Sequence, residues 1–308
     1  MKYKKRFIIC NLLAGLTALT YSCGKNKSPI ELLVTKELNF PSASAIEFYH
    51  NKLFLFGDDA THLLVLSPNY QPTDSINYWQ GSFHRIPKPV KPDIESSLLL
   101  EEGGETILYG IGSMSDVNRW KVIKHKLNSQ QTDTFSYFIS KNILAQINQL
   151  NIEGSATVNN TIVLANRANL SNPVNHLLYW DRADVHLISK QLLLPKQKTV
   201  AGVSGLYYVK EGDLLLLTAS EEEAASTTKD GTIGESYLGG IKNFSKKLND
   251  AEFKPDFFYQ LSKADDRFSK QKIESVCLET IGDDELILHL AADNDNGKSH
   301  LFRIRLKQ

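Results

Sequence analysis

The feature that most constrains the fold of this chain is a two-strand pattern that occurs five times between residues 44 and 290. In each copy a short strand opens on serine or glutamate, a polar turn follows, and a strongly apolar strand comes next. The first strands are 44–48, 95–99, 153–157, 204–208 and 274–278, and the second strands are 52–56, 106–110, 161–165, 213–218 and 285–290. Such a repeat indicates a chain built from equivalent supersecondary units.

Each unit has room for two further strands. The openings are 51, 58, 51 and 70 residues apart, and third strands are predicted at 62–66, 120–126, 176–180, 237–242 and 300–306. Because four strands make one blade of a β-propeller, we predict an all-β propeller with five blades. A degenerate sixth blade, hidden in the 70-residue interval or around 80–92, is the alternative. A β-sandwich fits less well, since it does not predict units that repeat at this spacing.

The two ends of the chain complement each other. The last unit ends at Gln308 without a fourth strand, whereas an unassigned strand at 31–38 precedes the first unit. A propeller whose N-terminal strand completes the last blade leaves no open edge between its termini. We therefore predict that 31–38 closes the ring. The one helical pattern, at 140–150, is interpreted as a connection between blades.

The N-terminus has the pattern of an export signal. Four of the first six residues are basic, and an apolar stretch from 7 to about 20 follows. This stretch is too short for a comfortable membrane span of roughly 20 residues, which favours a signal peptide. The sequence Ser22-Cys23 resembles a bacterial lipoprotein processing site, in which the cysteine becomes the lipidated N-terminus. An ordinary secretory signal is the alternative.

These assignments divide the chain into a lipoprotein signal peptide at 1–22, a polar tether at 23–29 and one propeller domain at 30–308. Lipidation of Cys23 would hold the protein in the cell envelope as an outer-membrane lipoprotein that faces the periplasm or the cell surface. The membrane is then a partner through the lipid anchor. Only Cys277 lies in the predicted propeller, so neither a disulfide framework nor a cysteine zinc site is expected within one chain.

Charge excludes one large class of function. The 35 basic and 35 acidic residues balance, and loss of the leader with its four basic residues brings the net charge to about −4. Nucleic-acid binding needs clustered lysine and arginine for phosphate contacts, and no long basic run follows residue 6. We therefore expect no nucleic-acid partner.

Carboxylates should converge at one end of the channel. The first strand of each blade lines the central channel of a propeller, so the opening residues Ser44, Glu95, Glu153, Ser204 and Glu274 should meet at one mouth. Loops after the second strands should add further polar residues there, namely Asp58, Asp59, Asp116, Arg119, Asn166, Arg167, 221–223, Asp293 and Asp295. Carboxylates in a narrow channel repel one another and lose hydration, so something must neutralise them.

A bound cation is one solution, with Glu95, Glu153 and Glu274 as metal ligands. Ca²⁺ is the candidate ion, because it takes several carboxylate and carbonyl oxygens. Bidentate pairing with Arg119 and Arg167 is a second solution. In a third, purely structural reading, each glutamate accepts backbone N–H bonds that tie the blade openings together.

These residues support two functions. The favoured prediction is a binding module for a small or polymeric ligand at the channel mouth, with Asp58 and Asp293 as further contacts. The alternative is a metal-dependent hydrolase of the phosphoesterase or lactonase class. In that enzyme the glutamates act as metal ligands or base, and Arg119 or Arg167 holds an anionic substrate.

Several segments resemble those of an uncharacterised family of bacterial propeller lipoproteins. They are 85–88 with 91–95, 150–154, 166–167, 57–59 and 218–239, and the resemblance spans about 40–306. It implies a propeller but no particular activity. That family is in turn similar to the esterase-like phytase propellers through its Ile-Glu blade openings. Ser44 and Ser204 stand where that pattern has glutamate.

Overall fold

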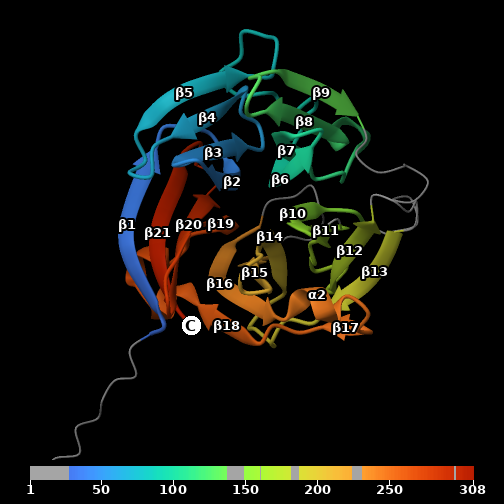
Figure 1. The fold of residues 1–308 in the computed structure, drawn as a ribbon, viewed down its shortest axis with the longest axis vertical. Coiled ribbons are helices and arrows are strands. Elements are labelled where there is room, and N and C mark those ends of the chain that lie inside the picture. Colours follow the sequence, from blue (N-terminus) through green and yellow to red (C-terminus); the bar gives the residue numbers. More distant parts are fainter. Residues whose placement is uncertain (1–27, 137–148, 160, 182–186, 224–230, 295) are drawn as a thin grey trace, which may run out of the picture.

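The computed structural model describes residues 28–136, 149–159, 161–181, 187–223, 231–294 and 296–308. Within these residues the strands form five sheets arranged in a ring around a central axis (Figure 1). The predicted all-β propeller with five blades is confirmed. The leader with Cys23, most of the helical pattern at 140–150, and Asp295 lie outside the described residues.

The first four blades each consist of strands in chain order from the centre outward. Blade 1 is β2 (Ala43–Tyr49), β3 (Lys52–Gly57), β4 (His62–Leu66) and β5 (Pro72–Asn77). Blade 2 is β6 (Ile94–Glu102), β7 (Glu105–Gly112), β8 (Lys121–Lys126) and β9 (Thr132–Ser136). Blade 3 begins with β10 (Ile152–Val158), β11 (Thr161–Asn166), β12 (Asn175–Asp181) and β13 (Leu187–Leu192). Blade 4 is β14 (Ala201–Val209), β15 (Leu214–Glu222), β16 (Ile233–Lys242) and β18 (Phe257–Gln260).

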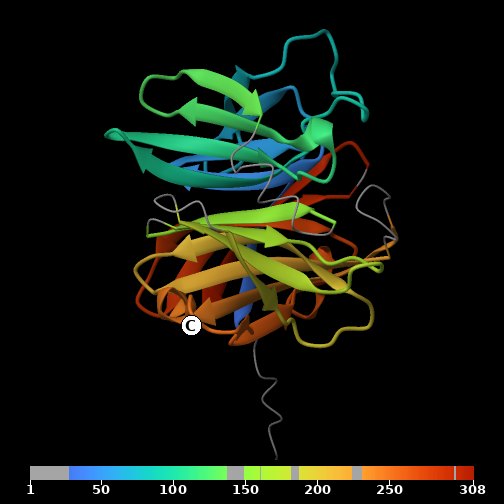
Figure 2. The ribbon, with the colours of Figure 1, turned by 90° about the vertical axis from the view of Figure 1, so that its right-hand side faces the viewer.

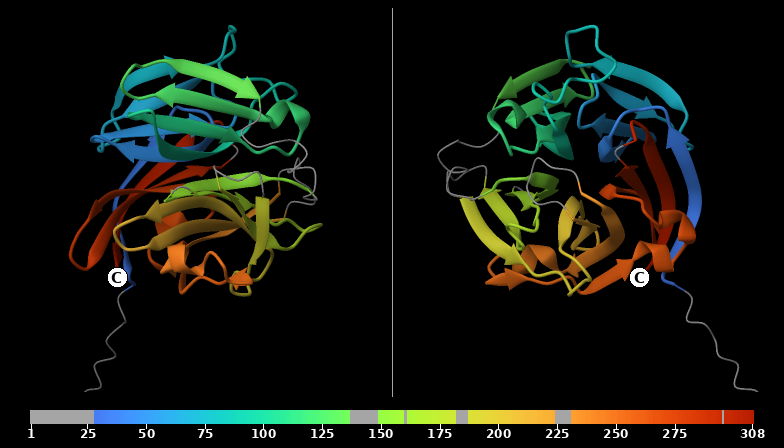
Figure 3. Two further views of the ribbon diagram at one scale, coloured as in Figure 1. Left: turned by 45° about the vertical axis from the view of Figure 1, so that its right-hand side comes forward. Right: turned by 180° about the vertical axis from the view of Figure 1, so that it is seen from behind.

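The N-terminal strand completes the fifth blade. This blade contains β19 (Ile273–Ile281), β20 (Glu285–Asp293), β21 (Ser299–Lys307) and β1 (Ile30–Leu38). β1 pairs antiparallel with β21 along its length, from Ile30 opposite Leu306 to Leu38 opposite Ser299. Figures 1 and 3 show the blue β1 beside the red β21 at the outside of the ring. The predicted closing strand is therefore confirmed.

The long interval before the last blade does not hold a sixth blade. It contains α2 (Phe244–Lys247), the two-residue strand β17 (Glu252–Phe253), and 3-10 helices at Leu261–Lys263 and Asp266–Phe268. β17 pairs in parallel with β13, so it adds a fifth strand to blade 3. The described stretch 80–92 contains no strand. The alternative of six blades is wrong, because α2 and β17 pack against blades 3 and 4, and the two 3-10 helices pack against blades 4 and 5.

The core lies between neighbouring blades. Leu98, Leu100 and Tyr109 of blade 2 pack with Ile162 and Leu164 of blade 3 in one buried cluster. A side view shows the sheets of these two blades one above the other (Figure 2). Burial of the apolar faces of adjacent sheets holds the ring together and fixes the inner strands around the channel. Among the described residues, no helix is long and apolar enough to cross a membrane.

Candidate cation site at the channel mouth

A β-bulge places the opening residue of every blade. The register of each first pair of strands shifts between Ala43 and Ala45, Ile94 and Ser96, Ile152 and Gly154, Val203 and Gly205, and Ile273 and Ser275. The residue left without a partner in each case is the predicted opening residue. A bulge bends its strand and redirects the side chain of the extra residue. The same backbone irregularity therefore presents Ser44, Glu95, Glu153, Ser204 and Glu274 at the mouth.

Three of these residues form a compact group of carboxylates. One carboxylate oxygen from each of Glu95, Glu153 and Glu274 lies within 4.8 Å of the other two. Glu153 is 9% exposed and Glu274 is 4% exposed, so water screens their charges poorly. Ca²⁺ binds oxygens at about 2.3–2.6 Å, and two ligands on opposite sides of such an ion are about 5 Å apart. The spacing of the group thus suits one ion held between three blades.

The two opening serines have a different role. The Ser44 hydroxyl donates to the Ile94 carbonyl, and the Ser204 hydroxyl donates to the Ile273 carbonyl at 2.6 Å. Each bond runs to the residue that precedes the opening glutamate of the next blade. The serines therefore tie neighbouring blades together and leave the three glutamates as the carboxylates of this ring.

A chain of buried ion pairs connects two of the glutamates. Arg167 lies 3.1 Å from Glu153 and 3.2 Å from Glu222, through different guanidinium nitrogens. Lys272 continues the chain, 3.5 Å from Glu222 and 3.0 Å from Glu274. Burial would lower the pKa of Arg167, but the charges of Glu153 and Glu222 outweigh it and raise that pKa. Glu274 and Glu222 likewise raise the pKa of Lys272 against the effect of burial, so both basic residues keep their charge.

A glycine in blade 4 makes room for the arginine. A Cβ on Gly202 would lie 2.5 Å from Arg167 Cγ and 2.7 Å from its Nε. No side chain can occupy this position without moving the guanidinium away from Glu153. Gly202 stands two residues before Ser204, in the position where other blades place polar side chains toward the mouth.

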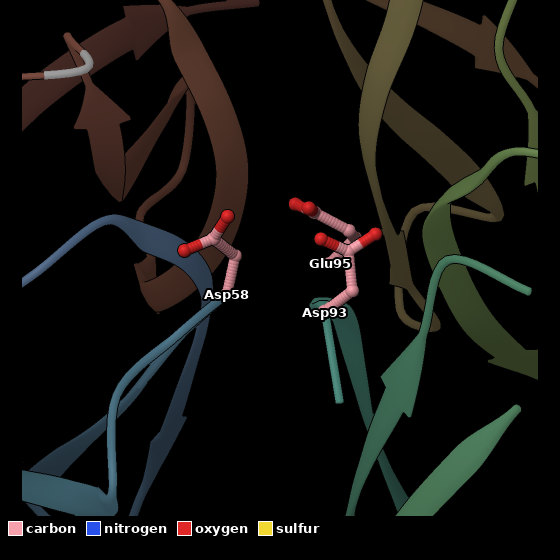
Figure 4. A group of neighbouring side chains, drawn as sticks. All are labelled: Asp58, Asp93 and Glu95. Carbon is pink, nitrogen blue, oxygen red and sulfur yellow. The ribbon is translucent and has the colours of Figure 1, made fainter. Parts of the chain in front are cut away.

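Glu95 belongs to a second carboxylate group as well. Oxygens of Asp58, Asp93 and Glu95 also lie within 4.8 Å of one another, and Figure 4 shows Asp58 facing Asp93 and Glu95 across the mouth. The ammonium of Lys91 contacts Asp58 and lies 2.6 Å from Asp93. Arg119, at the end of the 3-10 helix Val117–Arg119, lies 2.8 Å from Asp93. This second group therefore contains its own cations.

Burial and neighbouring charges raise the pKa of two glutamates of the first group. Burial raises the pKa of Glu95 well above its usual value, and the charges of Asp93, Glu153 and Glu274 raise it further. Burial also raises the pKa of Glu274 well above its usual value, although Lys272 opposes this effect. A carboxyl group with a raised pKa takes up a proton unless another positive charge is supplied. The first group therefore favours an added cation.

Comparison with known proteins gives a family for this chain. A family described as "Family of unknown function (DUF6929)" matches residues 39–306. The chain belongs to this family. No curated protein sequence matches it. The DUF6929 match covers all five blades except the closing strand β1.

Solved structures similar to this DUF6929 chain are distant in sequence. A Bacteroides fragilis protein named "Putative exported protein" is 12% identical, with a TM-score of 0.45 over 92% of this chain and 97% of that chain. The tail fiber of Staphylococcus aureus phage P68 is 12% identical, with a TM-score of 0.44 over 91% of this chain and 52% of that one. The computationally designed Ika4 protein is 12% identical, with a TM-score of 0.29 over 66% of this chain and 91% of that chain. The similarity to esterase-like phytases stays a prediction.

The other predicted site residues of this family member take several positions. Arg119 bonds Asp93 rather than a glutamate of the first group, so the predicted pairing with the glutamates applies to Arg167 alone. Asp293 is buried at the end of β20, and its backbone N–H donates to the Lys272 carbonyl at 3.1 Å. Its charge helps to raise the pKa of Glu274. Asp116 and Glu223 are exposed.

Several residues of the site were missed in the sequence, and they share a position. Asp93, Asn151 and Lys272 each stand two residues before an opening glutamate. The Asn151 amide donates to Glu153 at 2.6 Å, and Lys272 pairs with Glu274. A polar residue thus recurs at an equivalent position in three copies of the repeat, and this recurrence was a readable signal. Lys91 carried no such signal, whereas Glu222 lies in the stretch 221–223 that was expected at the mouth.

Proposed function

We propose that this protein is an exported, lipid-anchored propeller that binds a divalent cation at its channel mouth, with Ca²⁺ as the best fit. The observation that carries the proposal is the group Glu95, Glu153 and Glu274, whose oxygens from three blades lie within 4.8 Å of one another. All three donors are carboxylates. Hard cations such as Ca²⁺ prefer oxygen ligands, whereas zinc and copper favour histidine and cysteine.

The charge balance around this group supports a divalent ion. Four carboxylates, Glu95, Glu153, Glu222 and Glu274, adjoin two basic residues, Arg167 and Lys272. When all four carboxylates are ionised, two negative charges have no matching cation in this group. A divalent ion would neutralise them and remove the reason for the raised pKa of Glu95 and Glu274.

A binding role is favoured over hydrolysis by the state of the basic residues. Arg119, Arg167 and Lys272 all contact carboxylates, so none is poised to hold an anionic substrate. The cation would then serve as the contact for an external small-molecule or polymer ligand, or stabilise the ring. Turnover of phosphate esters or lactones that is lost in Glu153→Gln would instead assign the site to a hydrolase.

The cation is tested on the chain from residue 28, after treatment with a chelator. We expect saturable thermal stabilisation by Ca²⁺, of about 2.7 kcal/mol when the free ion is at about 100 times its Kd. Mg²⁺ should act more weakly, because it demands a smaller octahedral site. Glu153→Gln should abolish the effect, and the exposed Glu211→Gln is the matched control. A chain that responds to no ion would contradict the proposal.

The anchor is tested separately on protein isolated from membranes. Mass spectrometry should find a mature N-terminus at Cys23 that carries the lipid mass. Cys23→Ser should shift the protein to the soluble fraction, because one acyl-bearing residue supplies the whole membrane affinity in this proposal. Cleavage at another position, or an unmodified Cys23, would remove the lipid anchor and leave the cation site untouched.

A further inference from the structure

A small cavity lies in the channel next to the glutamate group. Its volume is about 10 Å³, close to the space that one water molecule needs. Glu95 and Glu153 line it, together with Ser96, Ser275 and other residues of the innermost strands. The cavity thus adjoins the position that the proposed cation would occupy.

Two hydroxyls at this cavity have no hydrogen-bond partner among the described residues. Ser96 is 3% exposed and Ser275 is 6% exposed, and neither Oγ is bonded. Buried hydroxyls in native proteins are almost always paired with protein or with ordered water. The neighbouring cavity serine Ser155 follows this rule, since its hydroxyl donates to the Ser97 carbonyl at 2.9 Å. Both unpaired hydroxyls therefore point to a missing partner.

The bulges explain why these serines adjoin the carboxylates. Ser96 follows Glu95 and Ser275 follows Glu274, each directly after the extra residue of its strand. The equivalent positions in blades 3 and 4 are Gly154 and Gly205. A Cβ on Gly205 would lie 2.6 Å from Thr218 Oγ1, so this position leaves no space for a side chain. The equivalent residue of blade 1 is Ala45, so among the described residues only Ser96 and Ser275 supply hydroxyls at this level of the ring.

We propose that the cavity holds one water molecule, bound by the Ser96 and Ser275 hydroxyls, and that this water is the inner ligand of the cation. The inference rests on the proposed cation site and adds the ligand that the cation has on the side facing into the channel. Ca²⁺ takes six to eight oxygens, which often include water. This water is a neutral ligand that two hydroxyls hold in place, and it completes the coordination sphere of the cation on the channel side. Exchangeable ligands then approach the cation only from the mouth.

The test is calorimetric titration of chelator-treated protein with Ca²⁺. Ser96→Ala with Ser275→Ala should lower the Ca²⁺ affinity by about 10–100-fold, as for other residues that orient metal ligands. The stoichiometry should stay at one ion, and the unfolding midpoint without ion should change little, because neither hydroxyl bonds another described residue of the protein. Ser155→Ala is the matched control, which removes a paired hydroxyl from the same cavity. It should lower stability and leave affinity unchanged.

The outcomes separate this inference from the proposed function. If the wild type and the double variant bind Ca²⁺ with equal affinity, the role of the serines is overturned and the cation site stands. An equal loss of affinity in Ser155→Ala would also overturn it, since general packing would then explain the effect. No binding by the wild type would overturn both proposals. If the double variant does not fold, each single variant should still weaken binding by about 10-fold, the lower end of that range, and unchanged affinity in both would overturn the inference.

Discussion

Replacing Arg167 with methionine should lower the free energy of unfolding by about 3–5 kcal/mol, the usual cost of breaking a buried ion pair from one side. The guanidinium lies between Glu153 and Glu222, and its side chain is 6% exposed. Methionine fills a similar volume but leaves two buried carboxylates without their shared cation. Urea denaturation at neutral pH measures the loss directly.

Two further variants test the cause of this effect. Adding Glu222→Gln to Arg167→Met should recover part of the stability, because Lys272 is then the only cation left in the chain of ion pairs and Glu222 no longer competes with Glu274 for it. Arg267→Met breaks an ion pair with Asp265 whose arginine side chain is 56% exposed, and it should cost at most about 1 kcal/mol. Equal losses for Arg167→Met and Arg267→Met would contradict the prediction, because the cost of breaking an ion pair would then not depend on its burial.

Removing β1 should have an effect of similar size. A chain that begins at residue 39 loses the partner of β21 and the buried side chains of Ile30 and Leu38. Burial of two such side chains contributes about 3–6 kcal/mol, and the exposed edge of β21 invites association between chains. Chemical denaturation and light scattering should therefore detect a less stable protein that self-associates.

A peptide of residues 28–40 tests whether the strand itself closes the ring. Added to the shortened chain, it should restore the unfolding midpoint in a saturable manner, because it supplies the missing edge. A peptide with Ile30→Asp and Leu38→Asp keeps the backbone but cannot bury its ends, and it should not restore stability. Full stability of the shortened chain alone would contradict the closing role of β1.

The arrangement of the blades was predictable because the repeat is periodic. Strand pairs with polar turns recur at similar spacing, and the surplus strand 31–38 matches a missing place in the last unit. Equivalent positions in a cyclic fold face the same axis, so the sequence alone predicts Glu95, Glu153 and Glu274 at one mouth. The 70-residue interval was ambiguous, because β17 joins blade 3 instead of building a unit of its own.

The pairing of charges was less predictable. Lys272 and Asn151 each stand two residues before an opening glutamate in the aligned repeats, and that signal was readable. Arg119 bonds Asp93 because a 3-10 turn directs it there, and such a turn depends on long-range contacts. Lys91 lies in an irregular segment, so no period predicts that its ammonium would lie between Asp58 and Asp93.

The sequence by itself determined the repeated unit, the closing strand and the set of glutamates at the mouth, because apolar periodicity and repeat position specify which residues face the axis. The tertiary structure excluded the sixth blade. Only the tertiary structure decided how the charges of these glutamates are balanced. The bulges at the five openings, the space beside Gly202 and the unpaired hydroxyls of Ser96 and Ser275 arise where different blades meet. Electrostatic energy changes over a few ångströms, and those distances are set by packing between strands that are far apart in the chain.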